Sequence, residues 1–274
     1  MTSHRPIPRR DLRLVTKRVL PAVRASIKVG YFSLAVEGAE RVPREGPVVF
    51  VANHSGWFTV DSFFFALAVA DHVGVDRFPY GATHDSMLAL PWLGSFLERM
   101  GGFPATWLRE PSLIPKEMQR FLVYPEGAAG NTKPFWKAYR MQAWRSGFAR
   151  LALERRAMVV PVAIVGGEEV MPVVCALRCL ESRVHAAIPV PVVPWPLPAR
   201  WKVVFHDPVA VRDLEVDTGD PAEAARRRHE LIARVRSTVQ RTLDHETQSH
   251  RLTRWSRFFA RGLTRARVAL TDDR

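Results

Sequence analysis

Three short runs of β-branched and aromatic residues, each followed at once by a turn-forming segment, constrain the fold more than any other feature of this sequence. Such runs are typical of buried strands. Two segments with helical patterns, about Thr59–Ala70 and Tyr139–Arg155, lie between them. Strands that alternate with helices predict an α/β domain with a largely parallel sheet, whose functional groups are expected at the carboxyl ends of the strands. The three runs are Val48–Ala52 before Asn53–Trp57, Phe121–Tyr124 before Pro125-Glu126-Gly127, and Met158–Val165 before Gly166-Gly167.

Other segments complete the expected domain. Trp201–Phe205 predicts a last strand, and the charged stretch Asp220–His245 holds strong helix formers that predict a surface helix. Pro189–Pro198 has five prolines in ten residues, so we expect it to be extended and irregular. Cys175 and Cys179 are spaced as neighbours on a helix. We expect them to be reduced core thiols, because two cysteines supply neither a zinc site nor a disulfide framework.

The charge of the chain gathers at its two ends. The net charge is +13; residues 1–28 carry eight Lys or Arg against one acid, and residues 251–274 carry seven Arg against two acids. We expect one α/β domain over residues 36–210, with a sheet flanked by helices, and a basic amphipathic helical segment over residues 1–35 that faces a membrane. Residues 211–274 are expected to form C-terminal helices, the last of them Arg-rich and amphipathic. The apolar residues at helical spacing are Leu12, Val15, Val19, Val23 and Ile27 at one end and Leu252, Trp255, Phe259 and Leu263 at the other.

An apolar stripe in a basic helix is typical of a segment that lies in an anionic lipid interface, where each nearby cation contributes about 1 kcal/mol. The alternative is that these helices pack on the domain and expose a solvated basic face. The longest apolar run, Phe63–Ala70, has eight residues, whereas a membrane-spanning helix needs roughly 18 to 20. The start of the chain lacks the pattern of a secretory signal. We therefore expect a peripheral protein on the cytoplasmic side of an anionic membrane surface. Nucleic acid is not expected as a partner, since no reader motif accompanies the high charge.

His54 is the first candidate for catalysis. It directly follows a predicted buried strand, where an imidazole can act as a general base at neutral pH. Such a base needs a partner that fixes its tautomer, and a carboxylate is the usual one. Asp61 is the nearest carboxylate, and seven residues of helix make about two turns, which would bring both side chains to the same side. From this spacing alone, a histidine that caps a turn beside an unrelated surface aspartate is an equal alternative.

The loop Tyr124–Lys133 after the second strand is another candidate site. It places Glu126 and a glycine-rich backbone at the edge of the sheet, followed by a cation at Lys133. Such a loop can bring amide groups and a lysine close to a phosphate or a polar head group. The alternative is a plain connection from strand to helix. The sequence contains no Gly-x-Ser-x-Gly elbow and no Gly-x-x-x-x-Gly-Lys-Ser/Thr loop, which disfavours a serine hydrolase or a nucleotide-hydrolysing enzyme.

Four blocks follow one another along the chain, and their combination is far more specific than any one of them. They are Asn53-His54-Ser55-Gly56 with Asp61; Gly101-Gly102-Phe103-Pro104-Ala105; Tyr124-Pro125-Glu126-Gly127 with Lys133; and Val160-Pro161-Val162-Ala163-Ile164-Val165-Gly166. From about Val36 through Pro208 the sequence resembles the glycerolipid and lysophospholipid acyltransferase family, and in particular 1-acylglycerol-3-phosphate acyltransferases.

The resemblance implies an acyltransferase domain in which His54, oriented by Asp61, removes the proton from the hydroxyl of a lysolipid acceptor. The oxygen then attacks the thioester of acyl-CoA or of an acyl carrier protein. The resemblance also implies substrate binding by Glu126, Gly127 and Lys133. No metal and no bound cofactor are expected, because the thioester already carries the activated acyl group.

The sequence departs from the family pattern in two places that concern the site. Six residues separate His54 from Asp61, whereas the commonest form of the family has four. Ala128 and Ala129 stand where the family often has an arginine that resembles a phosphate ligand; Lys133, Lys137 or Arg140 could take its place. Two other classes of protein stay open: a membrane-docked lipid-binding protein without activity, and a hydrolase that activates water on a lipid ester.

Overall fold

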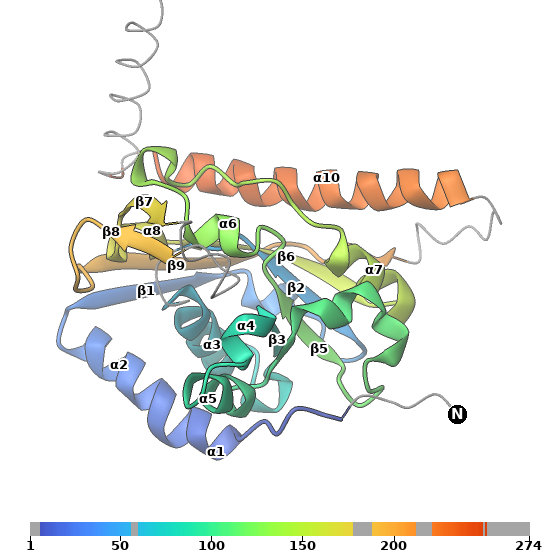
Figure 1. Ribbon diagram of the computed structural model, residues 1–274, viewed down its shortest axis with the longest axis horizontal. Coiled ribbons are helices and arrows are strands. Elements are labelled where there is room, and N and C mark those ends of the chain that lie inside the picture. Colours follow the sequence, from blue (N-terminus) through green and yellow to red (C-terminus); the bar gives the residue numbers. More distant parts are fainter. Residues whose placement is uncertain (1–5, 56–59, 178–187, 212–220, 249, 251–274) are drawn as a thin grey trace, which may run out of the picture.

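The computed structural model describes residues 6–55, 60–177, 188–211, 221–248 and 250. Its centre is a seven-stranded sheet with the strand order β1-β9-β6-β2-β5-β3-β4 (Figure 1). Neighbouring strands are parallel except β6 and β9, so β1 and β9 run opposite to the other five. The predicted α/β class with a largely parallel sheet is confirmed. The strands are β1 Phe32–Glu37, β2 Val48–Ala52, β3 Tyr80–Thr83, β4 Gly102–Pro104, β5 Arg120–Val123, β6 Met158–Val165 and β9 Ala199–Phe205.

Helices cover both faces of this sheet, which makes three layers (Figure 1). On one face α3 (Val60–His72) packs Phe64 and Phe65 against β2 and β9. On the other face Phe148 of α7 (Gly147–Arg155) and Val235 of α10 (Pro221–Glu246) close the core. All five residues of β2 are buried, because alternate side chains enter the two cores. That double burial explains the continuous apolar run of β2.

Several predicted elements differ from the observed ones. The helix predicted over Tyr139–Arg155 begins only at Gly147, and Tyr139 has a positive φ of 59° that no helix contains. Cys175 lies in a strand, so the helical placement of the cysteines is wrong; Cys179 lies outside the described residues. The proline-rich segment is irregular only after Pro191, because its start pairs in a small second sheet. That sheet is the antiparallel hairpin of β7 (Val173–Leu177) and β8 (Ile188–Pro191).

The N-terminal helix packs its apolar stripe on the domain. It runs from Leu12 to Lys28 through a π-helical turn. Val15 and Leu20 are 0% and 1% exposed and contact residues of α3, among them Leu67. The helix therefore packs on the domain, as the alternative expects, and the membrane-facing role of residues 1–35 stays a prediction. The stripe packs inward because α3 itself exposes apolar side chains that need a cover.

The remaining described elements are short. The predicted Arg-rich helix near the C-terminus lies outside the described residues. Among the described helices, none is long and apolar enough to cross a membrane. The remaining helices are α1 Leu12–Leu14, the π-helical turn Val15–Val19, α2 Leu20–Lys28, α4 Asp85–Leu88, α5 Leu93–Arg99, α6 Ala128–Asn131 and α8 Gly167–Val170, and the 3₁₀ turns are Ala39–Arg41, Val75–Arg77, Ala105–Arg109, Pro111–Leu113 and Phe135–Lys137.

Candidate active site

His54 and Asp61 form a buried hydrogen-bonded pair. His54 lies two residues after the end of β2, Asp61 lies at the start of α3, and the two side chains are 8% and 0% exposed. His54 Nδ1 lies 2.7 Å from Asp61 Oδ2. The same oxygen accepts the backbone N–H of Ser55, and Oδ1 accepts that of Ser62. An ionised carboxylate only accepts hydrogen bonds, so Nδ1 carries a proton and Nε2 presents its lone pair. The contact predicted from the sequence is present despite the longer spacing.

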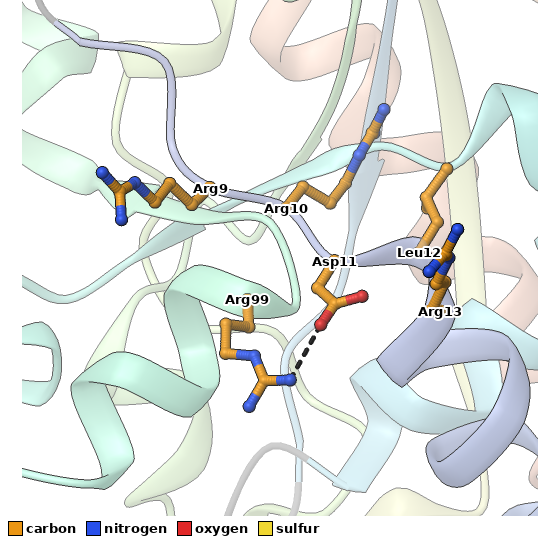
Figure 2. A pocket seen from close by; sticks show the side chains of 6 residues that line it. All are labelled: Arg9, Arg10, Asp11, Leu12, Arg13 and Arg99. Atoms are coloured by element: carbon orange, nitrogen blue, oxygen red, sulfur yellow. Dashed lines mark hydrogen bonds and ion pairs between the residues drawn. The ribbon is translucent and has the colours of Figure 1, made fainter.

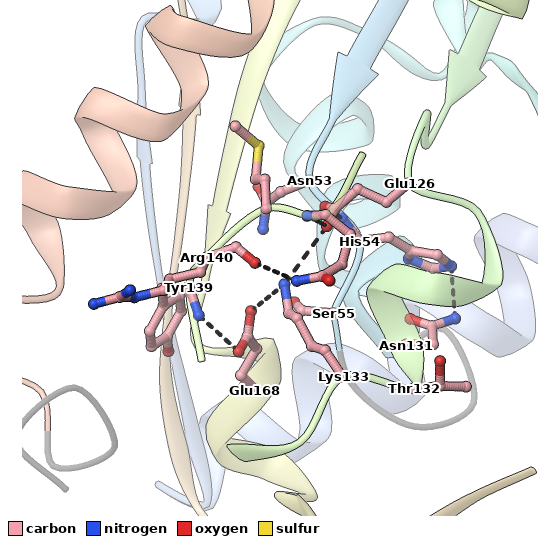
Figure 3. A network of polar contacts seen from close by, with 12 residues as sticks. Asn53, His54, Ser55, Glu126, Asn131, Thr132, Lys133, Tyr139, Arg140 and Glu168 are labelled. Carbon is pink, nitrogen blue, oxygen red and sulfur yellow. Dashed lines mark hydrogen bonds and ion pairs between the residues drawn. The ribbon is translucent and has the colours of Figure 1, made fainter. Parts of the chain in front are cut away.

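The other side of the imidazole faces α6. Asn131 Nδ2 lies 2.7 Å from His54 Nε2 (Figure 3). Because a neutral imidazole that donates at Nδ1 can only accept at Nε2, Asn131 presents its amide nitrogen here. Sequence reasoning missed Asn131, since nothing in the chain order indicates that α6 reaches His54.

Tyr124 fixes the plane of the imidazole. Its ring stacks on that of His54, with centroids 4.1 Å apart and planes 12° from parallel. The Tyr124 hydroxyl lies 3.0 Å from Ser62 Oγ on α3. Burial raises the pKa of Tyr124 well above its ordinary value, and the nearby Asp61 raises it further. The phenol therefore stays neutral and acts as a rigid wall of the site.

Glu126 holds backbone amides rather than facing outward. Its Oε1 accepts the N–H of His54 at 3.0 Å, and its Oε2 accepts the N–H of Gln142 at 2.6 Å. The side chain is fully buried. Glu126 thus links the end of β2 to the segment before α7. The geometry does not support its predicted direct contact with substrate, because both carboxylate oxygens are buried and bind backbone amides.

Lys133 is enclosed between two carboxylates (Figure 3). Its Nζ lies 2.7 Å from Glu168 Oε1 and 3.8 Å from Glu126 Oε2, and its side chain is 3% exposed. Burial alone disfavours the ammonium, but the two carboxylates outweigh it and raise the pKa of Lys133. Burial raises the pKa of Glu168, against the opposing effect of Lys133. The prediction that Lys133 reaches a head group is corrected, because its charge is already used inside the protein.

Two further predicted binding residues, Gly127 and Arg140, lie in different surroundings. Gly127 has φ 55° and ψ −145° before α6, a conformation that favours glycine. Arg140 is exposed, and Figure 3 shows its guanidinium directed away from His54. A different cation stands at the loop: the guanidinium carbon of exposed Arg145 would lie 3.9 Å from a Cβ built on Gly127.

Two more residues, one from the first sequence block and one from the glycine-rich loop, support the site. Asn53 bridges β2 to β6, because its Nδ2 donates to Ile164 O at 2.9 Å and its Oδ1 accepts Ile164 N–H at 2.8 Å. Gly130 lets α6 approach closely: a Cβ there would lie 2.7 Å from His54 O and 2.8 Å from His54 Cβ. The backbone N–H of Ser55 donates to Asp61, so it is not free to bind an oxyanion.

A basic hollow of about 700 Å³ lies elsewhere, where the N-terminal segment meets α5 (Figure 2). Its guanidinium groups point in different directions rather than toward one point. Asp11 and Arg99 pair at 2.8 Å, and Arg10 stacks 4.3 Å from the ring centroid of Tyr80. The hollow therefore does not form a converging phosphate site. Within the described ranges, no three His, Cys, Asp or Glu side chains are placed to hold a metal ion.

Comparison with known proteins agrees with the geometry around His54. Residues 33–165, which run from the second residue of β1 to the end of β6, match the model of the family described as Acyltransferase. This matched segment belongs to the acyltransferase family. It carries both His54 and Asp61, as well as the loop around Glu126.

Relatives of this chain occur in mycobacteria. An uncharacterised protein of Mycobacterium tuberculosis (strain ATCC 25618 / H37Rv) is 31% identical over 237 residues, which are 82% of this chain. An uncharacterised protein of Mycobacterium leprae (strain TN) is 32% identical over 225 residues, or 78% of this chain. The chain spans 64% and 60% of the length of these two relatives.

Among solved structures, the 1-acyl-sn-glycerophosphate (LPA) acyltransferase PlsC from Thermotoga maritima has a similar fold. The TM-score is 0.57 and the identity 18%, over 86% of this chain and 81% of that one. At this identity the likeness shows the shared fold alone, and it agrees with the parallel sheet and flanking helices of Figure 1.

Proposed function

We propose that this protein transfers a fatty acyl group from acyl-CoA or an acyl carrier protein to the hydroxyl of a lysophospholipid or a related glycerolipid. The observation that carries the proposal is the buried Asp61–His54 pair, whose Nε2 lone pair is presented at the carboxyl end of β2. Family membership supports acyl transfer as the reaction type. The charged ends of the chain support a peripheral location on the cytoplasmic side of an anionic membrane.

In the proposed reaction His54 moves one proton. Nε2 removes it from the acceptor hydroxyl as the oxygen attacks the thioester carbon. The carbon–sulfur bond then breaks, and the leaving thiolate takes the proton back from the imidazolium, so an ester and a thiol are the products. Asp61 stabilises the imidazolium between these steps and keeps Nδ1 protonated.

Asn131 has to yield its place during this reaction. Nε2 has one lone pair, which accepts the Asn131 amide in the absence of substrate. An acceptor hydroxyl that donates to Nε2 displaces that amide, which then lies beside the bound hydroxyl. No bound cofactor enters the proposal, because the thioester supplies the activated acyl group.

The acceptor head group is proposed to meet Arg145 rather than Lys133. Lys133 is enclosed by Glu126 and Glu168, whereas Arg145 is exposed beside Gly127. A guanidinium there can bind a phosphate with two parallel hydrogen bonds. The proposal thus keeps a phosphate-bearing lysolipid as the favoured acceptor.

The test is thiol release from acyl-CoA and from acyl carrier protein, with and without a panel of lysolipids. We expect release that depends on one acceptor class and that falls at least about 100-fold in His54→Ala, the scale of general-base catalysis. His229→Ala is the matched control, because His229 is exposed on α10. Release that needs no acceptor indicates a hydrolase, and equal rates in His54→Ala and wild type reject the catalytic assignment.

A further inference from the structure

Exposed apolar side chains gather at one end of the molecule. Six of them, between 38% and 77% exposed, come from three segments that are far apart in the sequence. We call this surface the apolar end. It consists of Val29 and Tyr31 between α2 and β1, Val174 and Leu177 on β7, and Val192 and Trp195 between β8 and β9.

Hydrogen bonds join the three segments. The Tyr31 hydroxyl donates to Pro196 O, which ties the α2–β1 corner to the chain after β8. Val192 N donates to Pro172 O at 2.7 Å, which ties that chain to the start of β7. Figure 1 shows the β7–β8 hairpin and the α2–β1 corner at the same end of the molecule, on the left.

The topology puts this surface at the same end of the strands as His54. β9 and β1 run opposite to β6 and β2, so β9 begins where β6 ends, with Lys202 paired to Val165. The segments that precede β1 and β9 therefore lie at the carboxyl end of β2, from which the chain continues to His54. Three strand spacings separate β1 from β2, which is about 14 Å at about 4.8 Å per strand.

The described segments that form the apolar end carry cations and no acid. Residues 26–36, 171–177 and 188–203 contain no Asp or Glu. Lys28 and Arg200, both exposed, lie in these segments. Tyr31 and Trp195 are aromatic residues with a polar tip, the types enriched where a protein meets the head-group region of a bilayer. An apolar and aromatic surface whose described segments carry the exposed cations Lys28 and Arg200 fits anionic lipid better than it fits water.

We infer that the apolar end docks onto the head-group region of a bilayer that contains anionic lipids. The stripe of the N-terminal helix, the surface first expected to do this, packs on the domain, with Val15 buried and Leu12, Val23 and Ile27 partly buried. Docking at the apolar end brings the mouth of the site to within about three strand spacings of the membrane, so an acceptor lipid reaches His54 without leaving the interface. The delivery of an acceptor lipid to His54 rests on the proposed function, whereas the docking itself does not.

The first test places an environment-sensitive fluorophore at one position at a time. Val192→Cys is labelled in a full-length chain that also carries Cys175→Ser and Cys179→Ser, and vesicles of phosphatidylglycerol or phosphatidylcholine are added without substrate. We expect a blue shift and at least about a two-fold rise in emission with the anionic vesicles. Trp92→Cys, labelled alike, is the control: Trp92 is 91% exposed on the loop between α4 and α5, which pack on the opposite edge strand β4.

The second test measures vesicle sedimentation. The pair Val192→Glu and Trp195→Glu should weaken partition into anionic vesicles about ten-fold, a change of about 1.4 kcal/mol, while Trp92→Glu should not. The inference is overturned if the emission of the fluorophore at position 192 stays that of a label in water while the protein is bound to vesicles, or if the emission at position 92 changes as strongly. It is also overturned if the emission at position 192 changes with protein concentration in the absence of vesicles, because that would indicate that a second copy of the chain covers this surface. Because these binding experiments contain no substrate, a failure of docking does not contradict acyl transfer. A failure of thiol release likewise does not change the interpretation of the binding experiments.

Discussion

Replacing Lys133 by methionine tests whether this residue supports the fold or binds substrate. The ammonium lies 2.7 Å from Glu168 and 3.8 Å from Glu126, and the three side chains are 3%, 6% and 0% exposed. Methionine preserves most of the volume but leaves two buried carboxylates without their counter-charge. Removing one partner of a buried ion pair costs about 3 to 5 kcal/mol. At about 2 to 4 °C per kcal/mol, the melting temperature should fall by roughly 6 to 20 °C.

Thermal and urea unfolding followed by circular dichroism measure this change. The double variant Lys133→Met with Glu168→Gln is the internal control. An amide at position 168 can still accept the N–H of Tyr139, a bond of 2.7 Å in the structure, while it removes one unpaired charge. It should recover more than half of the lost stability. A single variant with an unchanged melting temperature and a raised KM for a phosphate-bearing acceptor would refute this reasoning and restore Lys133 as a ligand.

The loss should also depend on pH. Burial raises the pKa of Glu168, and Lys133 is the main opposing influence, so its removal raises that pKa further. A carboxyl with a raised folded-state pKa contributes stability that is present below its unfolded value, about 4.3, and is lost as pH rises through the folded value. The deficit of Lys133→Met should therefore be larger at about pH 7.5 than at about pH 4.5. The opposite trend would contradict the arrangement of Figure 3.

Two further substitutions test the geometry around His54. Asp61→Asn should lower kcat/KM about 10²- to 10⁴-fold. In one orientation the NH₂ group of the asparagine faces the backbone N–H of Ser62, and in the other it faces the ring Nδ1–H of His54 and the backbone N–H of Ser55, so a donor always meets a donor. Rates within two-fold of wild type would remove Asp61 from the mechanism. Gly130→Ala should lower activity about 100-fold, since its Cβ would lie 2.7 Å from His54 O and force α6 away. Gly81→Ala, where a Cβ meets no atom within 4 Å, should be nearly neutral in the same thiol-release assay, and equal losses in both variants would contradict this account.

The parts of the fold that could be predicted are those in which local pattern and burial agree. β2 and β6 have the predicted bounds, because strands covered on both faces need continuous apolar residues. The segment before α7 could not be predicted, because distant side chains satisfy its backbone. Glu168 accepts the N–H of Tyr139, and Gln240 accepts that of Met141. With those amides already bonded, the chain has no need of helical hydrogen bonds there.

The same distinction applies to the site. His54 and Asp61 lie close in sequence, so their contact could be predicted from spacing and residue type. The contact between Asn131 and His54 spans 77 positions, and only the folded chain brings them together. The prediction for Lys133 rests on its charge and on its place in the third block, and the buried partner that uses this charge, Glu168, follows a different strand. Residue type indicates what a side chain can bind, whereas burial decides whether a substrate can reach it.

This division of charge determines where acceptor selectivity can arise. Glu126, Glu168 and Lys133 use their charges on one another and on backbone amides, so together they set the position of the loop that carries Asn131. In the proposed reaction a substrate at His54 Nε2 takes the place of the Asn131 amide, and the exposed Arg145 beside Gly127 is the cation proposed to meet its head group. Substitutions in the buried trio should therefore change stability and kcat together. Substitutions at Arg145 should change which acceptor is used while the melting temperature stays the same, because the guanidinium is exposed.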